Sequence, residues 1–471
     1  MNRAIVRRFA AAGCALLLSD AALAGGETSP RPLAFFTLMS DHGPVARAIM
    51  DGGDACPVLA TKGDGDDHGD GKTIAMVMRA EPANLPLRPT KSTIENSKPS
   101  RFPVRVCEAD LPLRARTASI AGHALPLPAA RVRRIIIIGD TGCRIKASDN
   151  AVQDCNVPAA WPFASIAKQA AAWKPDLVLH VGDYLYRENP CPAGHDGCAA
   201  TPWGYGWDAW NADFFTPALP LLAAAPWIMV RGNHESCLRA GQGWWRFLAA
   251  QALVPGQDCN AVADDVRGDQ SPPYAVPLGK GAQIIAMDLA IAGEEAIPAT
   301  DPRHDGMIAT QADVTALAKG HRYTFLTDHY PLLGLTATRK DGAVKIKSGN
   351  KAILSTFGIA DPSLALPGID MLLAGHVHEW QQVDFRDHPG QFISGMAGTQ
   401  EDVVAIPTDK ALGAEPAPGT RVTGFDSWTG HFGFMTLERT GARRWTVQVH
   451  ALGGQIIHRC RIDGRHSSCT A

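Results

Sequence analysis

Polar side chains that commonly bind metal ions follow five apolar runs of this chain, each at the point where the run ends. The runs span residues 135–138, 177–181, 227–230, 323–326 and 369–373. Short apolar runs that end at polar or glycine residues are typical of buried parallel strands, whose carboxyl ends meet at one edge of a sheet. That edge would carry the following side chains: Asp140, Asp183, Tyr186, Asn233, His234, His329, His376 and His378.

Carboxylate, phenolate, amide oxygen and imidazole are hard to borderline ligands, which suit Fe(III), Mn(II) or Zn(II). One ion cannot use so many groups, whereas two ions about 3.5–4 Å apart that share a carboxylate can. Each cluster alone has an ordinary structural reading: a capping Asp, a packed Tyr or a hydrogen-bonded core His. Five clusters that each follow a strand argue for a metal site instead.

The order of these clusters resembles a known pattern. It reads Asp-x-Gly (140–142), Gly-Asp-x-x-Tyr (182–186), Gly-Asn-His-Glu (232–235), His329 and Gly-His-x-His (375–378). This order is similar to that of the calcineurin-like metallophosphoesterase superfamily, and most similar to the purple acid phosphatases within it. Two features carry the finer resemblance: Gly142, where most of the superfamily has a metal-binding His, and Tyr186. The resemblance spans residue 134 to about residue 380.

The resemblance implies a fold and a set of site residues. The fold would be α/β, a layered α/β/β/α sandwich, and His234 would be the general acid that protonates the leaving group, with Glu235 orienting it or a neighbour. One metal would be held by Asp140, Asp183, Tyr186 and His378, and the second by Asp183, Asn233, His329 and His376, with Asp183 as the bridge.

The function that follows is an exported di-metal phosphohydrolase, an acid-phosphatase-like phosphomonoesterase that uses a metal-activated hydroxide on a small phosphorylated substrate. The expected metals are Fe(III) plus Fe(II), Zn or Mn. A phosphodiesterase or nucleotidase on the same centre is the alternative, and a non-catalytic surface-binding protein is a third reading. A formal net charge of −2 gives no sign of a nucleic-acid partner.

The first residues predict export to the periplasm or the medium. Residues 1–24 combine a basic head, an apolar stretch and a small-x-small site at Ala22-Leu23-Ala24, which is typical of a secretory signal peptide. Of the 11 cysteines, all except Cys14 follow this segment. An even number in an exported protein favours disulfides, and neighbour pairing suggests Cys56–Cys107, Cys143–Cys155, Cys191–Cys198, Cys237–Cys259 and Cys460–Cys469.

The rest of the chain divides into three further segments that differ in composition and in hydrophobic pattern. Residues 25–130, rich in Pro, Gly and short alternating runs, predict a small N-terminal β domain. Residues 131–455 would form the catalytic domain, with a helix over residues 161–173, and residues 456–471 a disulfide-closed tail. The aromatic segment 201–215 could form the lip of the substrate pocket, whereas packing in the core is the commoner role of such clusters. Two arginines beside the polar clusters could hold phosphate oxygens or form salt bridges: Arg144 and Arg231.

Overall fold

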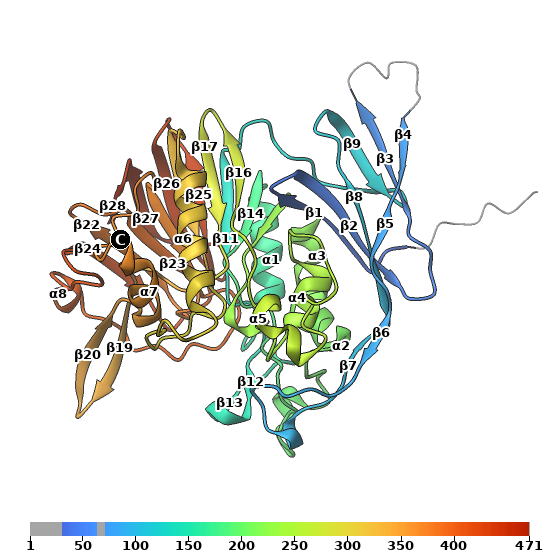
Figure 1. The fold of residues 1–471 in the computed structure, drawn as a ribbon, viewed down its shortest axis with the longest axis horizontal. Coiled ribbons are helices and arrows are strands. Elements are labelled where there is room, and N and C mark those ends of the chain that lie inside the picture. Colours follow the sequence, from blue (N-terminus) through green and yellow to red (C-terminus); the bar gives the residue numbers. More distant parts are fainter. Residues whose placement is uncertain (1–30, 64–70, 471) are drawn as a thin grey trace, which may run out of the picture.

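Two sheets packed face to face form the centre of the protein in the computed structural model, which describes residues 31–63 and 71–470 (Figure 1). The predicted signal peptide lies outside the described residues. The first sheet is 11-stranded, in the order β28-β27-β26-β25-β11-β14-β15-β1-β2-β8-β5. Its strands are β1 (Ala34–Ser40), β2 (Gly43–Asp51), β5 (Val77–Ala80), β8 (Val104–Asp110), β11 (Arg134–Ile138), β14 (Leu177–His180), β15 (Trp227–Met229), β25 (Gly433–Arg439), β26 (Arg444–Ala451), β27 (Ile456–Asp463) and β28 (His466–Thr470).

The second sheet is 7-stranded, in the order β16-β17-β18-β21-β23-β22-β24. Its strands β17, β18, β21 and β23 run parallel to one another. The strands are β16 (Tyr274–Gly279), β17 (Ala282–Ala286), β18 (Tyr323–Thr327), β21 (Met371–Ala374), β22 (Trp380–Phe385), β23 (Gly390–Ser394) and β24 (Val422–Trp428).

Alternation along β11 shows how the layers are built. Ile135 and Ile137 join a core that includes side chains of the second sheet, such as Phe325, whereas Ile136 and Ile138 join a core with the helices on the outer face. A strand buried on both faces must be apolar at every position, and this is the reason for the unbroken isoleucine run.

Helices cover the two outer faces. Three helices of the first half of the catalytic segment pack on the first sheet, and two later helices pack on the second sheet. The α/β/β/α sandwich is therefore confirmed, as is the helix expected over residues 161–173. The helices are α1 (Phe163–Ala172), α3 (Thr216–Leu222) and α4 (Gly241–Phe247) on the first sheet, α6 (His304–Ala318) and α7 (Lys351–Thr356) on the second, and the short α2 (Trp207–Trp210), α5 (Asp265–Gly268) and α8 (Thr408–Ala411).

The five apolar runs form strands β11, β14, β15, β18 and β21. Three of them are parallel neighbours in the first sheet and two are parallel neighbours in the second. The polar clusters therefore come from two sheets that face each other, and not from the edge of one sheet. A site built this way can surround a ligand from both layers.

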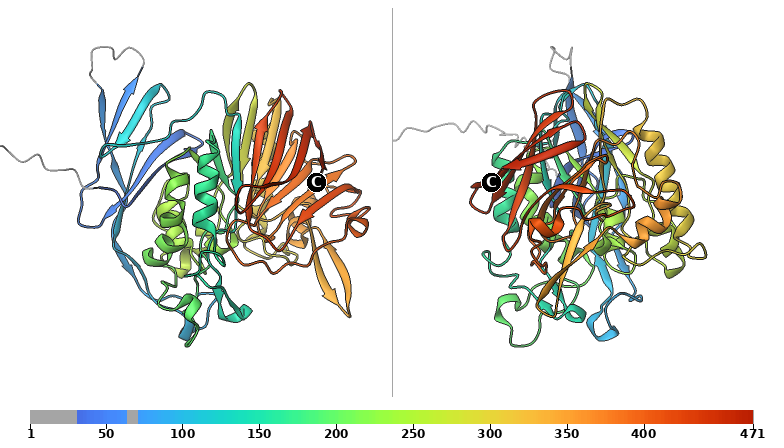
Figure 2. Two further views of the ribbon diagram at one scale, coloured as in Figure 1. Left: turned by 180° about the vertical axis from the view of Figure 1, so that it is seen from behind. Right: turned by 90° about the vertical axis from the view of Figure 1, so that its left-hand side faces the viewer.

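The N-terminal segment continues the first sheet. Strand β1 pairs in parallel with β15, with Leu38 opposite Trp227, and β2, β8 and β5 extend the sheet outward. A four-stranded sheet of β3 (Val58–Gly63), β4 (Lys72–Ala75), β9 (Ala115–Ile120) and β10 (His123–Ala124) packs on this extension (Figure 2). Strands β27 and β28 extend the same sheet at its other edge. The domain boundaries at residues 130 and 455 remain predictions.

Two buried arginines of the N-terminal strands fasten the C-terminal end of α4; we call them, with Glu108, the arginine clamp. Arg47 Nη1 donates to the carbonyl oxygens of residues 247 and 249, at 2.9 and 3.0 Å. Arg79 Nη2 donates to those of residues 245 and 251, at 2.8 and 2.9 Å. Both guanidinium groups also contact Glu108 Oε2, at 2.7 and 3.1 Å. The last carbonyls of a helix lack partners within the helix and carry partial negative charge, so cations suit this position.

An arm of the N-terminal segment, residues 83–102, runs down to the end of the sheets where β12 (Ile145–Lys146) and β13 (Ala151–Val152) lie (Figure 1). Its base is the pair β6 (Ala83–Leu85) and β7 (Ser100–Phe102), and its tip holds a short helix, η1 (Ile94–Asn96). Asn189 Nδ2 donates to Ser92 Oγ at 2.7 Å, and the backbone N–H of Lys91 donates to the Leu238 carbonyl at 3.0 Å. The N-terminal segment thus reaches the edge that carries the polar clusters.

Five disulfides join the pairs expected from neighbour spacing, so that prediction is confirmed: Cys56–Cys107, Cys143–Cys155, Cys191–Cys198, Cys237–Cys259 and Cys460–Cys469. Among the described residues, no helix is both long and apolar enough to cross a bilayer.

Candidate functional site

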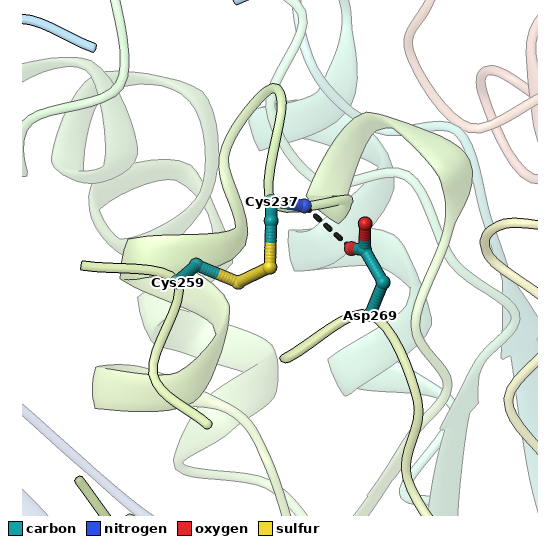
Figure 3. A group of neighbouring side chains, drawn as sticks. All are labelled: Cys237, Cys259 and Asp269. Atoms are coloured by element: carbon teal, nitrogen blue, oxygen red, sulfur yellow. Dashed lines mark hydrogen bonds between the residues drawn. A yellow bond between two sulfur atoms is a disulfide. The ribbon is translucent and has the colours of Figure 1, made fainter. Parts of the chain in front are cut away.

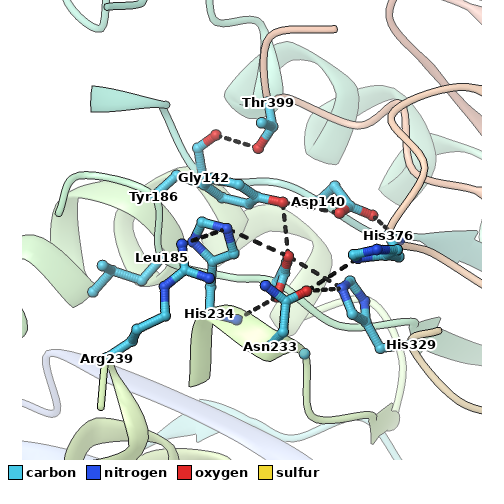
Figure 4. A network of polar contacts seen from close by, with 12 residues as sticks. Asp140, Gly142, Leu185, Tyr186, Asn233, His234, Arg239, His329, His376 and Thr399 are labelled. Carbon is cyan, nitrogen blue, oxygen red and sulfur yellow. Dashed lines mark hydrogen bonds and ion pairs between the residues drawn. The ribbon is translucent and has the colours of Figure 1, made fainter. Parts of the chain in front are cut away.

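The structure brings all eight of the predicted site residues to one end of the two sheets. Figure 4 labels Asp140, Tyr186, Asn233, His234, His329 and His376. Asp140 follows β11, Asp183 and Tyr186 follow β14, and the Asn233-His234 pair follows β15. From the second sheet, His329 follows β18 and the two histidines of Gly-His-x-His follow β21. Side chains up to 238 positions apart in the sequence therefore share one centre.

The first group gathers around the Tyr186 hydroxyl. Tyr186 Oη lies 2.9 Å from Asp140 Oδ1, 2.8 Å from Asp183 Oδ2 and 2.9 Å from His378 Nε2. These four residues are the ones expected to share the first metal.

The second group gathers around Asn233 Oδ1. This oxygen lies 3.1 Å from His329 Nε2 and 3.0 Å from His376 Nδ1, and His329 Nε2 also lies 3.1 Å from Asp183 Oδ2. Asp183 Oδ2 thus contacts Tyr186 of the first group and His329 of the second. The two groups meet at the one carboxylate that was expected to bridge them.

Three of these residues hold an unusual backbone conformation. Asp140, Asp183 and His376 have φ values of 56°, 58° and 72°, in the left-handed region that residues with a side chain rarely occupy. Such strain persists only where the surroundings fix it, and it concentrates at functional sites.

Gly142 is required by close packing. A Cβ atom at this position would lie 2.7 Å from the Tyr186 nitrogen and 2.9 Å from an Asp213 carboxylate oxygen. Tyr186 and Asp213 therefore fill the space that a histidine at position 142 would need.

The two aspartates are buried without a strong cation. Asp140 and Asp183 are 0% and 1% exposed, and among residues 31–63 and 71–470 no Lys or Arg pairs with either of them. Burial favours the neutral form of Asp183, but the imidazoles of His329 and His234 outweigh it and lower its pKa well below the usual value. Two buried carboxylates that face only imidazole, phenol and amide groups fit a site for added cations.

The two histidines nearest these carboxylates gain basicity. Burial alone would lower the pKa of His329, but Asp183 raises it to about 9. Burial likewise opposes the charged form of His378, whereas Asp140 and Asp402 raise its pKa to about 10.

His234 lies beside the two groups, and its ring is tilted by 36° against that of Tyr186, with centroids 3.8 Å apart. Its Nδ1 lies 3.0 Å from Glu188 Oε1, and its Nε2 lies 2.9 Å from Arg239 Nη2. Arginine can only donate, so Nε2 accepts and the ring proton sits on Nδ1. Burial, followed by the charge of Arg239, lowers the pKa of His234 to about 4.

Glu235 was expected to orient His234 or a neighbour, and the structure favours the second alternative. Glu235 accepts backbone N–H groups of residues 183, 184, 185 and 232, at 3.2, 2.9, 3.2 and 3.2 Å, and so fixes the loop that carries Asp183. Glu188, which orients the His234 ring, is fully buried and also binds Arg239 and the Tyr205 hydroxyl.

Sequence reasoning missed further carboxylates. Asp402 Oδ1 lies 3.2 Å from His378 Nδ1 and so fixes the ring that faces Tyr186. The buried Asp213 accepts the backbone N–H groups of Cys143, Tyr186 and Arg187, at 3.0, 2.8 and 3.0 Å. Neither residue follows an apolar run, so the pattern that found the other site residues gave no signal for them.

A cavity of about 390 Å³, which we call the main cavity, opens over the two groups. The hairpin of β19 (Leu335–Lys340) and β20 (Ala343–Ser348) forms one wall, and the loop that carries Asp402 forms another. Arg144 lines this cavity while paired with Asp402, whereas Arg231 is buried and paired with Asp269 and Asp288. Of these two arginines, Arg144 is therefore the one placed to meet a ligand.

The aromatic segment 201–215 does not line the main cavity, so its reading as a pocket lip is wrong. Trp210, Phe214 and Phe215 are fully buried in the core under the first sheet. Packing of large aromatic rings explains the segment, and Asp213 and Tyr205 link it to the site through Tyr186 and Glu188.

A second group of metal-type side chains, Cys237, Cys259 and Asp269, is not a metal site (Figure 3). The two sulfur atoms form a disulfide, and Asp269 accepts the backbone N–H of Cys237 at 2.6 Å. The group fixes the loop that follows His234.

Comparisons with known proteins agree with this geometry. A family model described as calcineurin-like phosphoesterase matches residues 133–380. No curated protein sequence matches the chain significantly. Among solved structures, the purple acid phosphatase PPD1 from yellow lupin (Lupinus luteus) seeds has a TM-score of 0.53 at 14% identity, over 93% of this chain and 74% of that one. A structure of PhoD has a TM-score of 0.52 at 12% identity, over 95% of this chain and 93% of that one.

At these identities the solved structures show a shared fold, while the family model shows membership. The matched segment covers over half of the chain and contains every residue of the two groups, from Asp140 to His378. The chain belongs to the calcineurin-like phosphoesterase family and is a phosphoric ester hydrolase.

Proposed function

We propose that this protein is an exported di-metal phosphomonoesterase of the acid phosphatase type. The observation that carries the proposal is the shared Asp183 Oδ2, which lies 2.8 Å from Tyr186 Oη and 3.1 Å from His329 Nε2. One carboxylate oxygen that contacts two donor groups is the arrangement that a pair of bridged metal ions needs.

The two groups assign the ligands. Asp140, Asp183, Tyr186 and His378 would hold one ion, and Asp183, Asn233, His329 and His376 the other. A phenolate ligand suits Fe(III), so we assign iron to the first position, with Fe(II), Zn or Mn in the second. Bound there, the two ions would activate water as the nucleophile and offset negative charge on the phosphoryl oxygens.

The chain's own groups would handle the leaving group. His234 lines the main cavity, and Glu188 holds its Nδ1. Arg239 lines the same cavity and donates to Nε2 when no substrate is present. When a phosphoryl group enters, its oxygens would take the Arg239 N–H groups, and Nε2 would be free to carry the proton that the leaving oxygen needs.

The monoester assignment is supported by Tyr186 in the donor set and by the tight packing at Gly142. Both are features by which the sequence resembles the purple acid phosphatases. The five disulfides and the apolar leader support export.

A pair of substrates tests the proposal. Metal-loaded protein should hydrolyse the monoester phenyl phosphate with a higher kcat/KM than the diester diphenyl phosphate. The reverse order would make the protein a phosphodiesterase. His234→Ala should slow turnover of an alkyl phosphate about 10²–10⁴-fold, as expected for the loss of a general acid, with metal content unchanged. Unchanged turnover would remove His234 from that role.

A further inference from the structure

A second cavity, of about 450 Å³, adjoins the main cavity; we call it the side cavity. Lys146, Asn233 and Arg239 line both cavities, so the two adjoin beside the second group of site residues. A substrate whose scissile phosphoryl group lies at the metal site would reach the side cavity past these three side chains.

The charged lining of the side cavity is mostly cationic. Four of its side chains are basic, namely Lys91, Lys146, Arg239 and Arg303, and Asp269 is its one carboxylate among the described residues. Asp269 is already occupied, because its Oδ1 accepts from Arg231 Nη2 at 3.1 Å and from a backbone N–H at 2.6 Å.

The basic side chains differ in how far the protein neutralises them. Arg239 is bound to Glu188, and Arg303 Nη2 lies 2.7 Å from Asp301; neither of these carboxylates lines the side cavity. Lys146 Nζ lies 3.6 Å from Asp149 and 3.8 Å from Glu188, beyond the range of a short ion pair.

Lys91 is the least neutralised of these four basic side chains. It is exposed and forms no ion pair within the part of the chain that the structure describes. Its backbone is nevertheless fixed, since its N–H donates to the Leu238 carbonyl at 3.0 Å. The N-terminal arm thus adds a lysine without an ion pair among the described residues to the lining of a cavity that three other cationic side chains also line, an arrangement that an anion would stabilise.

We propose that the side cavity binds a second phosphate group, and that the preferred substrates are small bisphosphorylated compounds. The main cavity would take the phosphoryl group to be cleaved, and Lys91 and Lys146 would hold the other one. This inference rests on the proposed function, since it needs the scissile group at the metal site.

The test compares fructose 1,6-bisphosphate with fructose 6-phosphate in metal-loaded enzyme, by release of inorganic phosphate. The wild type should show a lower KM for the bisphosphate. Lys91→Gln should lower kcat/KM for the bisphosphate about tenfold through KM, the worth of one charge-assisted contact, and leave the monophosphate unchanged. Lys98→Gln is the matched control, because Lys98 lies on the same arm, pairs with Asp208 and lines neither cavity.

Lys91→Glu sharpens the test, since a reversed charge should weaken the bisphosphate further and still spare the monophosphate. Equal kcat/KM for both sugar phosphates in the wild type, or equal losses for both in Lys91→Gln, would overturn the inference. The proposed phosphomonoesterase function would still stand. No hydrolysis of either compound by metal-loaded protein would overturn the proposed function, and this inference with it.

Discussion

The arginine clamp and the metal-type site both bury charge, but they satisfy it in opposite ways. In the clamp, Arg47 and Arg79 meet Glu108 and the carbonyl oxygens at the end of α4, all supplied by the chain itself. In the site, Asp140 and Asp183 meet imidazole, phenol and amide groups, and no Lys or Arg of the described residues pairs with them.

This difference separates structure from function. A buried charge is costly unless it is paired, so a fold that only needed stability would place a cation beside the two aspartates, as it places Glu108 beside the arginines. In the site, the described part of the chain supplies no Lys or Arg beside the two aspartates, so the position is open to a cation that binds from solution. The comparison predicts that changes in the clamp act on folding, whereas changes in the site act on metal binding and activity.

The largest effect is expected from Asp183→Asn. Loss of the shared carboxylate should lower kcat/KM about 10³-fold or more, because each metal ion contributes several kcal/mol to the transition state. Steady-state kinetics at saturating metal would measure this loss. Asp176→Asn is the control, since Asp176 lies before the start of the same strand β14 and, among the described residues, accepts backbone N–H groups of residues 133 and 134 alone. A mild loss in Asp183→Asn would place this residue outside the reacting centre.

Arg79→Ala should break the clamp. Arg79 is 2% exposed in its side chain, and its removal leaves Glu108 and several carbonyls with fewer partners. We expect the free energy of unfolding in urea to fall by about 3–5 kcal/mol, with kcat/KM of the folded protein unchanged. Substitution of the exposed Arg114 should change neither quantity. If Arg79→Ala lowered kcat/KM under conditions where the variant is fully folded, the clamp would not be purely structural.

Asp402→Asn should have a smaller effect, on metal affinity. Asp402 orients His378 through Nδ1 at 3.2 Å, and such supporting contacts are worth about 10–100-fold in metal affinity or activity. Because Asp402 is 54% exposed in its side chain, we expect about tenfold, the lower end of that range. Titration of activity against free metal would reveal the shift, and excess metal should restore turnover. Asp208→Asn, at 51% exposure and away from both cavities, is the matched control.

The smallest effect concerns acid stability. Burial opposes the charged form of Glu108, but Arg47 and Arg79 lower its pKa. A carboxyl group with a lowered pKa stabilises the folded state above its unfolded pKa and loses that contribution as the pH falls through its folded pKa. The unfolding midpoint of the wild type should therefore drop from neutral to acid pH, and Glu108→Gln should flatten part of that drop. Parallel profiles would show that Glu108 contributes nothing to it.

The sequence predicted the parts of the site that depend on strands. Asp183 and His329 were found because each directly follows an apolar run that can only be a buried strand, and strand ends gather at one edge. The helix α1 was expected from residues 161–173 themselves, and the layered α/β/β/α fold from the resemblance to the metallophosphoesterase superfamily. The apolar runs did not reveal which strands share a sheet, since pairing between β18 and β21 leaves no mark on either run.

Other residues could not be predicted because loops bring them to the site. Asp402 lies in an irregular loop after β23, and Lys91 lies at the tip of the N-terminal arm, far from any polar cluster. Their positions depend on tertiary contacts, such as Asn189 with Ser92, that no local pattern encodes. The aromatic segment 201–215 left two alternatives open, because its composition suits both a pocket wall and a core.

Metal stoichiometry tests the central claim most directly. Protein equilibrated with iron and zinc, freed of loosely bound ions and measured by elemental analysis, should hold two ions per chain, and Asp183→Asn should hold fewer. Wild-type protein that retains no transition metal under these conditions, while folded and disulfide-bonded, would contradict the account.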